Sequence, residues 1–280
     1  MTDSRMSFDE PYSRDESNPL DFAVAQRDRE TLAMVRRAVE RRDVVMAYQP
    51  VVQTSEPGRV AFYEGLIRVL DTTGRIIPAR DFISVIETTE LGRKVDCLAL
   101  ELGLRALAEQ PTLRLAVNMS ARSVGYPSWL KTLHRGLAVD ETIADRLILE
   151  ITESSAMQMP EIVTVFMEDL HQRGVSFALD DFGAGYTSFR YLREFYFDIL
   201  KIDGEFIRGI AQNPDNQVLT EALIGVARHF DMFTVAESVE SAEDAAYLSA
   251  LGVDCMQGYY FGAPTLRPPW SEQSGIVQRA

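Results

Sequence analysis

Two adjacent carboxylates, Asp180 and Asp181, follow a short apolar run, and this pair is the strongest chemical signal in the sequence. Neighbouring carboxylates at the end of a strand repel one another unless cations lie between or beside them. Oxygen ligands of this kind favour Mg²⁺ or Mn²⁺. The glycines in Phe182-Gly183-Ala184-Gly185 permit a tight turn and a close approach to a ligand. The pair therefore indicates a divalent-cation site.

An apolar run that ends in one polar or charged residue recurs along the chain. The residues in this position are Glu64, Asn118, Glu150, Asp180, Lys201, Glu237 and, in a weaker example, Gln257. Helix-like stretches separate most of the runs, which predicts a parallel sheet covered on both faces. The carboxyl ends of barrel strands form the active-site rim, so we expect these side chains to converge there with Asp181. Divalent cations would compensate their charge.

Several of these residues also have a simpler interpretation. A single Asp or Asn after a strand can cap the next helix, but glutamate is a poor cap and recurs at three of the positions. Lys201 could orient an attacking water or act only as a counter-ion for the carboxylates. Arg68, four residues after Glu64, could clamp a phosphate or remain a solvated rim charge.

The three histidines, His134, His171 and His229, fall in helical segments, so a histidine general base is not expected. No serine or cysteine triad is supported either. Water activated by paired metal ions needs no histidine and suits attack on a phosphodiester. A metal-dependent barrel acting on carbon acids is the alternative enzyme class, but the paired aspartates and Arg68 favour a phosphate substrate.

Composition limits the possible classes of protein. The chain has 280 residues and is 46% hydrophobic, enough for one α/β domain the size of a (β/α)8 barrel. Its formal net charge of −14 argues against a nucleic-acid polymer as partner. The two cysteines, Cys97 and Cys255, are expected in the core rather than in a disulfide. No secretion signal or membrane-spanning stretch stands out, so we expect a cytoplasmic protein that does not enter a membrane.

The order of segments predicts three regions: a disordered polar tail over residues 1–25, the barrel domain over 26–268, and an irregular tail over 269–280. A first strand is expected over residues 44–52. Apolar spacing and stop signals predict helical segments over residues 28–42, 81–88, 91–109, 127–137, 160–173, 186–193, 217–229 and 242–251.

Together these residues resemble the EAL-type cyclic di-GMP phosphodiesterases, whose signature strand is here Glu64-Gly65-Leu66-Ile67-Arg68. The resemblance covers about residues 30 to 266. The other matching motifs, in the family's order, are Tyr48-Gln49-Pro50, Asn118-Met119-Ser120, Glu150-Ile151-Thr152-Glu153, Asp180-Asp181-Phe182-Gly183, Leu200-Lys201-Ile202-Asp203, Ala236-Glu237-Ser238-Val239-Glu240 and Gln257-Gly258-Tyr259.

The resemblance implies a TIM-like (β/α)8 barrel with one antiparallel strand and hydrolysis of cyclic di-GMP, a bacterial second messenger, to linear pGpG. It also implies two divalent cations, Mg²⁺ or Mn²⁺, and we expect Ca²⁺ to inhibit. A homodimer is expected, whereas the sequence does not identify a regulatory protein partner.

Residue roles follow from the same resemblance. One cation would be bound by Glu64, Asn118, Glu150 and Asp180, and the other by Asp180, Asp181 and Glu237. Lys201 matches the lysine that holds the attacking water. Gln49 and Arg68 match substrate contacts, Glu240 and Gln257 match further active-site groups, and Glu153 matches a residue that stabilises the loop after Asp181.

Three positions depart from the family pattern: Gly65 replaces an alanine, Ala184 a threonine and Ser238 a glycine. None of these changes removes a metal ligand, so we expect an active phosphodiesterase. The alternative is a weak or inactive domain that serves as a cyclic di-GMP receptor or a protein-interaction module. The loop from residue 181 to 188 is expected to be the mobile, regulated part of the site.

Overall fold

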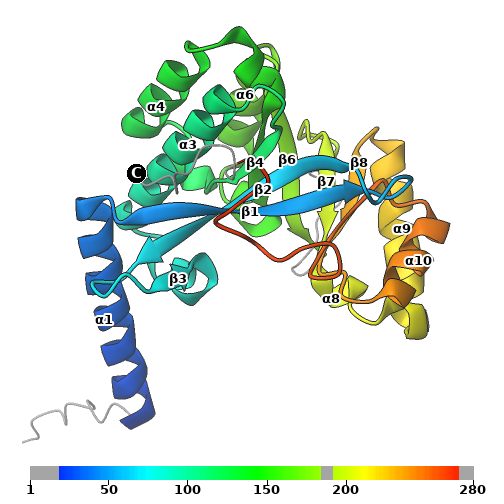
Figure 1. Ribbon diagram of the computed structural model, residues 1–280, viewed down its shortest axis with the longest axis horizontal. Coiled ribbons are helices and arrows are strands. Elements are labelled where there is room, and N and C mark those ends of the chain that lie inside the picture. Colours follow the sequence, from blue (N-terminus) through cyan, green and yellow to red (C-terminus); the bar gives the residue numbers. More distant parts are fainter. Residues whose placement is uncertain (1–18, 184–191, 271–280) are drawn as a thin grey trace, which may run out of the picture.

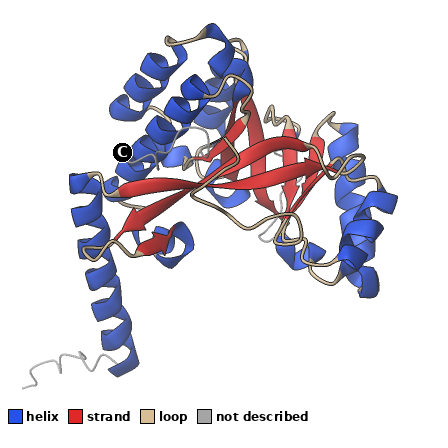
Figure 2. Cartoon of the chain, viewed as in Figure 1, coloured by secondary structure: helices blue, strands red, loops and turns tan. Residues whose placement is uncertain are grey.

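The computed structural model describes residues 19–183 and 192–270, and its strands form a single sheet (Figures 1 and 2). The strands are β1 (Val44–Gln53), β2 (Val60–Leu70), β3 (Ile76–Pro78), β4 (Leu115–Asn118), β5 (Leu147–Thr152), β6 (Ser176–Phe182), β7 (Ile199–Ile202), β8 (Phe233–Ala236) and β9 (Cys255–Gln257). Most are short and almost fully buried, as expected for parallel strands covered on both faces.

The sheet closes into the expected TIM-like barrel. Parallel pairing runs from β2 through β4, β5, β6, β7 and β8 to β9. β1 is antiparallel to both β2 and β9, which closes an eight-stranded barrel, and β3 pairs with β2 outside it. The predicted (β/α)8 barrel with one antiparallel strand is therefore confirmed. The long β1–β2 pair crosses the view in Figure 1 and extends from the barrel to β3.

Helices cover the outside of the barrel. Over residues 19–183 and 192–270, the α-helices are α1 (Pro19–Arg41), α2 (Ile83–Ile86), α3 (Glu90–Glu109), α4 (Pro127–Leu137), α5 (Glu153–Ala156), α6 (Pro160–His171), α8 (Gly204–Ile207), α9 (Pro214–His229) and α10 (Ala242–Leu251). Side chains of Thr89, Asn213 and Ser241 cap α3, α9 and α10 by accepting backbone N–H bonds. Gly252 ends α10 in the left-handed conformation.

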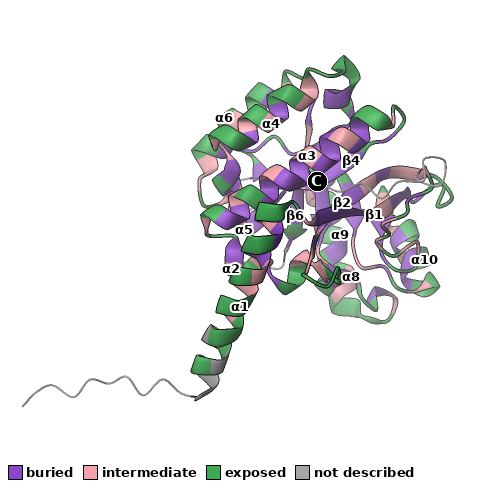
Figure 3. Cartoon of the chain, turned by 60° about the vertical axis from the view of Figure 1, so that its left-hand side comes forward, coloured by how far each residue is buried: buried purple, intermediate pink, exposed green. Residues whose placement is uncertain are grey.

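The first helix is longer than the sequence pattern predicts. It begins at Pro19, so residues 19–25, which we expected to lie in the disordered tail, form its first turns. Val35 and Ala38 near its end are buried, whereas Phe22 near its start is 60% exposed. Figure 3 shows that this first part projects away from the barrel. The packed end of the helix, at Val35 and Ala38, allows the helix to propagate toward Pro19.

The segment after β9 packs across the antiparallel strand. Thr265 exchanges two backbone hydrogen bonds with Tyr48 on β1. Trp270 packs edge-on against Tyr48 and Tyr63, at ring-centroid distances of 5.2 and 4.7 Å. The start of the irregular C-terminal segment therefore contacts the barrel. The short helix expected over residues 186–193 falls largely outside the described residues.

Candidate active site

An apolar layer closes the barrel interior directly below the polar residues. It consists of Val51, Phe62, Ala116, Ile148, Ala178, Ile199 and Val235, with Cys255 packed against it. Side chains two positions apart in a strand lie on the same face. Each residue of the apolar layer is two positions from a predicted site residue. The apolar residue and its polar neighbour therefore both face the barrel axis. The polar residues consequently form the next layer, which is the barrel mouth.

Lys201 lies at the centre of this polar layer. Its side chain is 1% exposed, and its Nζ lies 2.7 Å from Glu237 Oε1 and 2.8 Å from Asp180 Oδ1. Glu150 Oε2 and Glu64 Oε2 follow at 3.2 and 3.7 Å. One ammonium group therefore contacts carboxylates from four different strands or strand ends. The predicted convergence of these residues is present in the structure.

Glu64 is fixed by hydrogen bonds from both sides. Asn118 Nδ2 donates to Glu64 Oε1 at 2.9 Å, and Gln257 Nε2 donates to Oε2 at 2.6 Å. Gln257 also donates to Gln49 Oε1 at 3.2 Å. The expectation that Glu64 ends its strand is wrong, because β2 continues to Leu70. Antiparallel pairing with β1 and β3 sustains this continuation, so the carboxylate projects from mid-strand.

A β-bulge brings both aspartates of the pair to the mouth. Leu179 and Phe182 on β6 pair with Leu200 and Ile202 on β7, so two residues face the single Lys201. Asp181 adopts a left-handed backbone with φ of 54°, which strains most side chains but is tolerated by aspartate. In a regular strand, successive side chains would point to opposite faces. The bulge removes this alternation, and it also places Lys201 opposite the pair.

Burial and mutual repulsion shift the proton affinities of the cluster. Burial, followed by the charge of Asp180, raises the pKa of Asp181 to about 6. Burial raises the pKa of Glu237 to about 8, against the attraction of Lys201. Burial acts to lower the pKa of Lys201, but Asp180, Glu150 and Glu237 outweigh it and hold that pKa well above its usual value. Lys201 is therefore charged at neutral pH, whereas burial makes Glu150 and Glu237 resist ionisation by raising the pKa of each. Glu64 behaves differently: against burial, the charge of Lys201 and hydrogen bonds from Gln257 and Asn118 lower its pKa.

This donor set fits divalent cations. The site contains one ammonium group, that of Lys201, and five carboxylates, those of Glu64, Glu150, Asp180, Asp181 and Glu237. Their formal charges sum to −4, which two divalent cations would balance. Oxygen atoms of Asp180, Asp181 and Glu237 lie within 4.8 Å of one another. Within the described part of the chain, buried Oε1 atoms of Glu150 and Gln257 receive no hydrogen bond. Oxygen atoms of this kind are free to coordinate a hard cation or a water bound to it.

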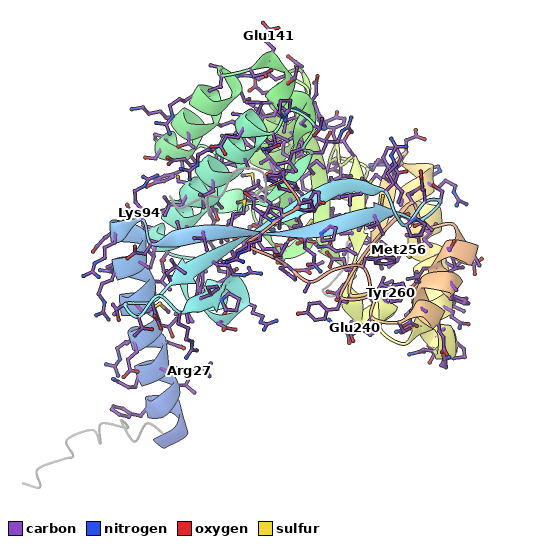
Figure 4. The ribbon with its side chains drawn as sticks, in the orientation of Figure 1. Arg27, Lys94, Glu141, Glu240, Met256 and Tyr260 are labelled. Carbon is purple, nitrogen blue, oxygen red and sulfur yellow. The ribbon has the colours of Figure 1, made fainter. Side chains whose placement is uncertain are left out.

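The remaining predicted residues lie around this cluster. Arg68 is half-buried on the same face of β2 as Glu64, and its Nη1 donates to the Ile67 carbonyl at 3.0 Å. Glu153 is buried and accepts the Gly183 amide at 3.4 Å. Glu240 does not join the cluster among the described residues: its side chain is 54% exposed and pairs with Arg208 at 3.9 Å. Figure 4 shows it near Tyr260, below Met256 of β9.

The structure accounts for two of the three departures from the family pattern. A Cβ atom at Gly65 would lie 2.8 Å from Met46 Sδ, so the methionine occupies the space of the missing methyl group. Ser238 has a left-handed backbone, with φ of 55°, which glycine adopts more easily. Its hydroxyl accepts a hydrogen bond from Arg208 at 3.1 Å. Ala184 lies outside the described residues.

Two residues that support the site were missed in the sequence. Asp96 is buried on α3 and bonds to the loop that follows Asn118. Ser155 on α5 bonds to the same loop. The sequence did contain a signal for Asp96, because an aspartate between Val95 and Leu98 falls on the apolar face of its helix and is therefore expected to need a buried partner. Ser155 gave no signal, because serine is common at the start of helices.

Comparison with known proteins identifies the family. The EAL domain model matches residues 32–264, so the chain belongs to the EAL domain family. Cyclic di-GMP phosphodiesterase PdeB of Shewanella oneidensis is 29% identical over 252 residues, which cover 88% of this chain and 29% of the relative. Cyclic di-GMP phosphodiesterase PdeF of Escherichia coli K12 is 32% identical over 243 residues, covering 84% of this chain and 32% of the relative. The chain thus spans about a third of the length of these curated relatives.

Solved structures share the same barrel. The PaMucR phosphodiesterase in complex with c-di-GMP superposes with a TM-score of 0.74 at 30% identity, covering 87% of this chain and 99% of the other. The FimX EAL domain from Pseudomonas aeruginosa bound to c-di-GMP gives 0.76 at 25% identity, covering 84% and 96%. The helices in the described part of the chain lack the continuous apolar stretch that spanning a bilayer requires.

Proposed function

We propose that this protein hydrolyses cyclic di-GMP to linear pGpG in a reaction that requires two divalent cations. The observation that carries the proposal is the group of four carboxylates around Lys201, with the bulged Asp180–Asp181 pair opposite it. The named activity of the relatives PdeB and PdeF supports the substrate. So does the cyclic di-GMP bound in the PaMucR and FimX structures.

The cations would be Mg²⁺ or Mn²⁺, held by the two ligand sets that share Asp180. The first set is Glu64, Asn118, Glu150 and Asp180, and the second is Asp180, Asp181 and Glu237. When bound, such ions lower the pKa of water and stabilise the charge that develops on the phosphate. Ca²⁺ should occupy the site but support little turnover, because its coordination is looser.

The side chains of this protein would orient the reactants. Lys201 keeps its proton at neutral pH, so it can donate a hydrogen bond to the attacking water but cannot act as the base. Arg68 can clamp a phosphate oxygen pair with the guanidinium N–H groups that remain after its bond to Ile67. Gln49 and Gln257 place amide groups beside Glu64 for further contacts. Water adds across one phosphodiester bond, which yields the linear dinucleotide.

The test is product analysis after incubation with cyclic di-GMP and Mg²⁺ or Mn²⁺. Linear pGpG should form with the wild type and fall by orders of magnitude in Glu64→Ala, which removes a proposed metal ligand. Glu168→Ala, which changes an exposed glutamate on α6, is the matched control and should retain full turnover. Equal turnover in well-folded Glu64→Ala would refute the assignment of the site.

Lys201→Ala separates the two roles considered for the lysine. If Lys201 orients the attacking water, turnover should fall far more than cyclic di-GMP affinity measured in Ca²⁺. A loss confined to affinity would favour the counter-ion role. Arg68→Ala should show the opposite behaviour, with affinity as the main loss.

Binding without hydrolysis is the second candidate function. The FimX EAL domain, at 25% identity, was solved bound to c-di-GMP and is not described as a phosphodiesterase, in contrast to PaMucR. The same experiment distinguishes the two functions. Tight cyclic di-GMP binding in Mg²⁺ with no pGpG after long incubation would establish a receptor.

A further inference from the structure

The loop after β4 is held by contacts that have no part in the proposed chemistry. It follows Asn118, the last residue of β4, and runs through the 3-10 turn Ala121–Ser123; we call it the Asn118 loop. The Met119 amide donates to the Glu150 carbonyl at 2.9 Å, which fixes the first step of the loop to β5. The rest of the loop is anchored to two helices, α3 and α5.

The first anchor is Asp96 on α3. A single oxygen, Asp96 Oδ2, accepts the Ser120 amide at 3.1 Å and the Ser123 hydroxyl at 2.6 Å. The side chains of Asp96 and Ser123 are both buried. The loop cannot shift without leaving this buried carboxylate and the buried hydroxyl without partners, which is costly away from water.

The second anchor is Ser155 on α5. Its hydroxyl oxygen accepts the Ala121 amide at 2.8 Å and lies 3.5 Å from Ser120 Oγ. The same four-residue helix begins with Glu153, whose carboxylate accepts the Gly183 amide at 3.4 Å. One short helix therefore contacts both the Asn118 loop and the segment that follows Asp181.

We propose that Asp96 and Ser155 are positioning residues that hold Asn118 at the metal site, and that α5 couples this position to Asp181. The proposal rests on the proposed function, because it takes Asn118 and Asp181 as metal ligands. Asn118 would bind through one neutral oxygen, so its contribution depends on placement rather than on charge. Residues that orient metal ligands in this indirect way typically change metal affinity by about 10–100-fold.

The first test compares Ser155→Ala with Ser154→Ala. Ser154 is the adjacent, exposed serine of α5 and bonds only to the Thr152 hydroxyl in the described structure, so it is a matched control. Titration with Mn²⁺ alone should give about tenfold weaker binding for Ser155→Ala and no change for Ser154→Ala. Ser155→Thr, which keeps the hydroxyl, should restore the affinity. Hydrogen exchange should become faster in Ser155→Ala over residues 119–123 and at Gly183.

The second test uses two changes at Asp96. Both hydrogen bonds reach one oxygen, so the amide carbonyl of Asp96→Asn can accept them and should keep the Mn²⁺ affinity within about twofold. Asp96→Ala removes the acceptor and should weaken Mn²⁺ binding about tenfold. If Asp96→Ala does not fold, the Ser155 series and Asp96→Asn still decide the outcome.

Three results would overturn the inference: unchanged Mn²⁺ affinity in Ser155→Ala, unchanged exchange at Gly183 in that variant, or weakened binding in Asp96→Asn. None of these measurements uses turnover. A wild type that binds Mn²⁺ and shows the expected variant effects but never forms pGpG would refute the proposed hydrolysis while supporting this inference. A wild type that binds no Mn²⁺ would refute both.

Discussion

Lys201 shows how one residue can organise a whole site. Four carboxylates lie within 4.0 Å of its Nζ, yet one positive charge cannot compensate them all in a buried setting. Burial, together with this excess of negative charge, raises the pKa of Glu237 to about 8 and that of Asp181 to about 6, so Glu237 largely keeps its proton at neutral pH. The metal-free site therefore binds protons where the metal-bound site would bind cations.

The pH dependence of metal binding should reflect this exchange. A cation binds the ionised carboxylates, so below about pH 8 it must displace the proton of Glu237, and below about pH 6 that of Asp181 as well. Apparent Mn²⁺ affinity should fall by about tenfold per pH unit for each displaced proton and level off above about pH 8. Calorimetry at pH 7 in buffers of different ionisation enthalpy should detect proton release. Zero release and a constant affinity from pH 6 to 8 would contradict the displacement of protons by the cation.

Asp96 should weaken the fold when it ionises. Burial raises its pKa to about 6, against hydrogen bonds from Ser123 and Ser120. An unfolded aspartate has a pKa of about 3.9, so ionisation is harder in the folded state. The resulting loss in the free energy of unfolding is absent below about pH 4, grows as the pH rises to about 6, and then remains near 3 kcal/mol.

The Asp96→Asn variant cannot ionise, so it should be more stable than the wild type at pH 8, by up to about 3 kcal/mol. This advantage should shrink to about half at pH 5, where the wild-type carboxyl is largely protonated. Urea unfolding at the two pH values measures the difference, with the exposed Asp169→Asn as the surface control. An advantage that does not change between pH 5 and pH 8 would show that ionisation of Asp96 is not its source.

At the scale of elements, helix positions followed the sequence more closely than strand geometry. Helices α3, α4 and α10 lie within a residue of the expected ranges, because caps, Pro and Gly act locally. The β6 bulge was not expected, because it arises from the pairing of β6 with β7. The bulge, rather than the strand end alone, places both aspartates opposite Lys201.

Arg146 ties the end of α3 to the start of β5. Its buried guanidinium Nη1 donates to the carbonyls of Leu107, Gln110 and Leu113 at 2.9 to 3.1 Å. The Gln110 carbonyl also accepts the Leu113 amide at 3.0 Å, so Arg146→Met should remove the donor of the Leu107 and Leu113 carbonyls and lower the free energy of unfolding by about 3 kcal/mol. Urea unfolding can measure this loss. Arg135→Met, at an exposed pair 3.9 Å long, should change stability by less than about 0.5 kcal/mol, and an equal loss in both variants would argue against the capping role.

At the scale of the whole molecule, closure of the barrel concentrates charge. Eight strands converge on one axis, the apolar layer around Phe62 and Ile148 fills the interior below, and the carboxylates can only face the open end. Separation of apolar and charged layers lets the lower layer stabilise the fold while the upper layer carries unfavourable repulsion. The charged residues thus lie at the end of the barrel where apolar packing contributes least to the stability of the fold.

Mn²⁺ should therefore stabilise the entire fold. The folded chain gathers the ligands and the unfolded chain does not, so Mn²⁺ at 100 times its dissociation constant should add about 2.7 kcal/mol. For a domain of this size the melting temperature should rise by roughly 5–10 °C. Differential scanning fluorimetry with and without Mn²⁺ measures the shift. Glu237→Gln should reduce it and Glu168→Gln should not; an equal shift in both would place the stabilising ion elsewhere.

The sequence by itself determined the barrel class and the residues of the polar layer. These features are local: apolar runs, helix caps and the two-residue alternation of strands place Glu64, Asn118, Glu150 and Glu237 on inward faces. Only the tertiary structure decided that Glu64 projects from mid-strand and that Asp180 and Asp181 both reach the mouth. It also decided that Asp96 supports the Asn118 loop. The physical reason is that strand register, bulges and buried hydrogen bonds depend on contacts between segments distant in the chain, which local patterns do not encode.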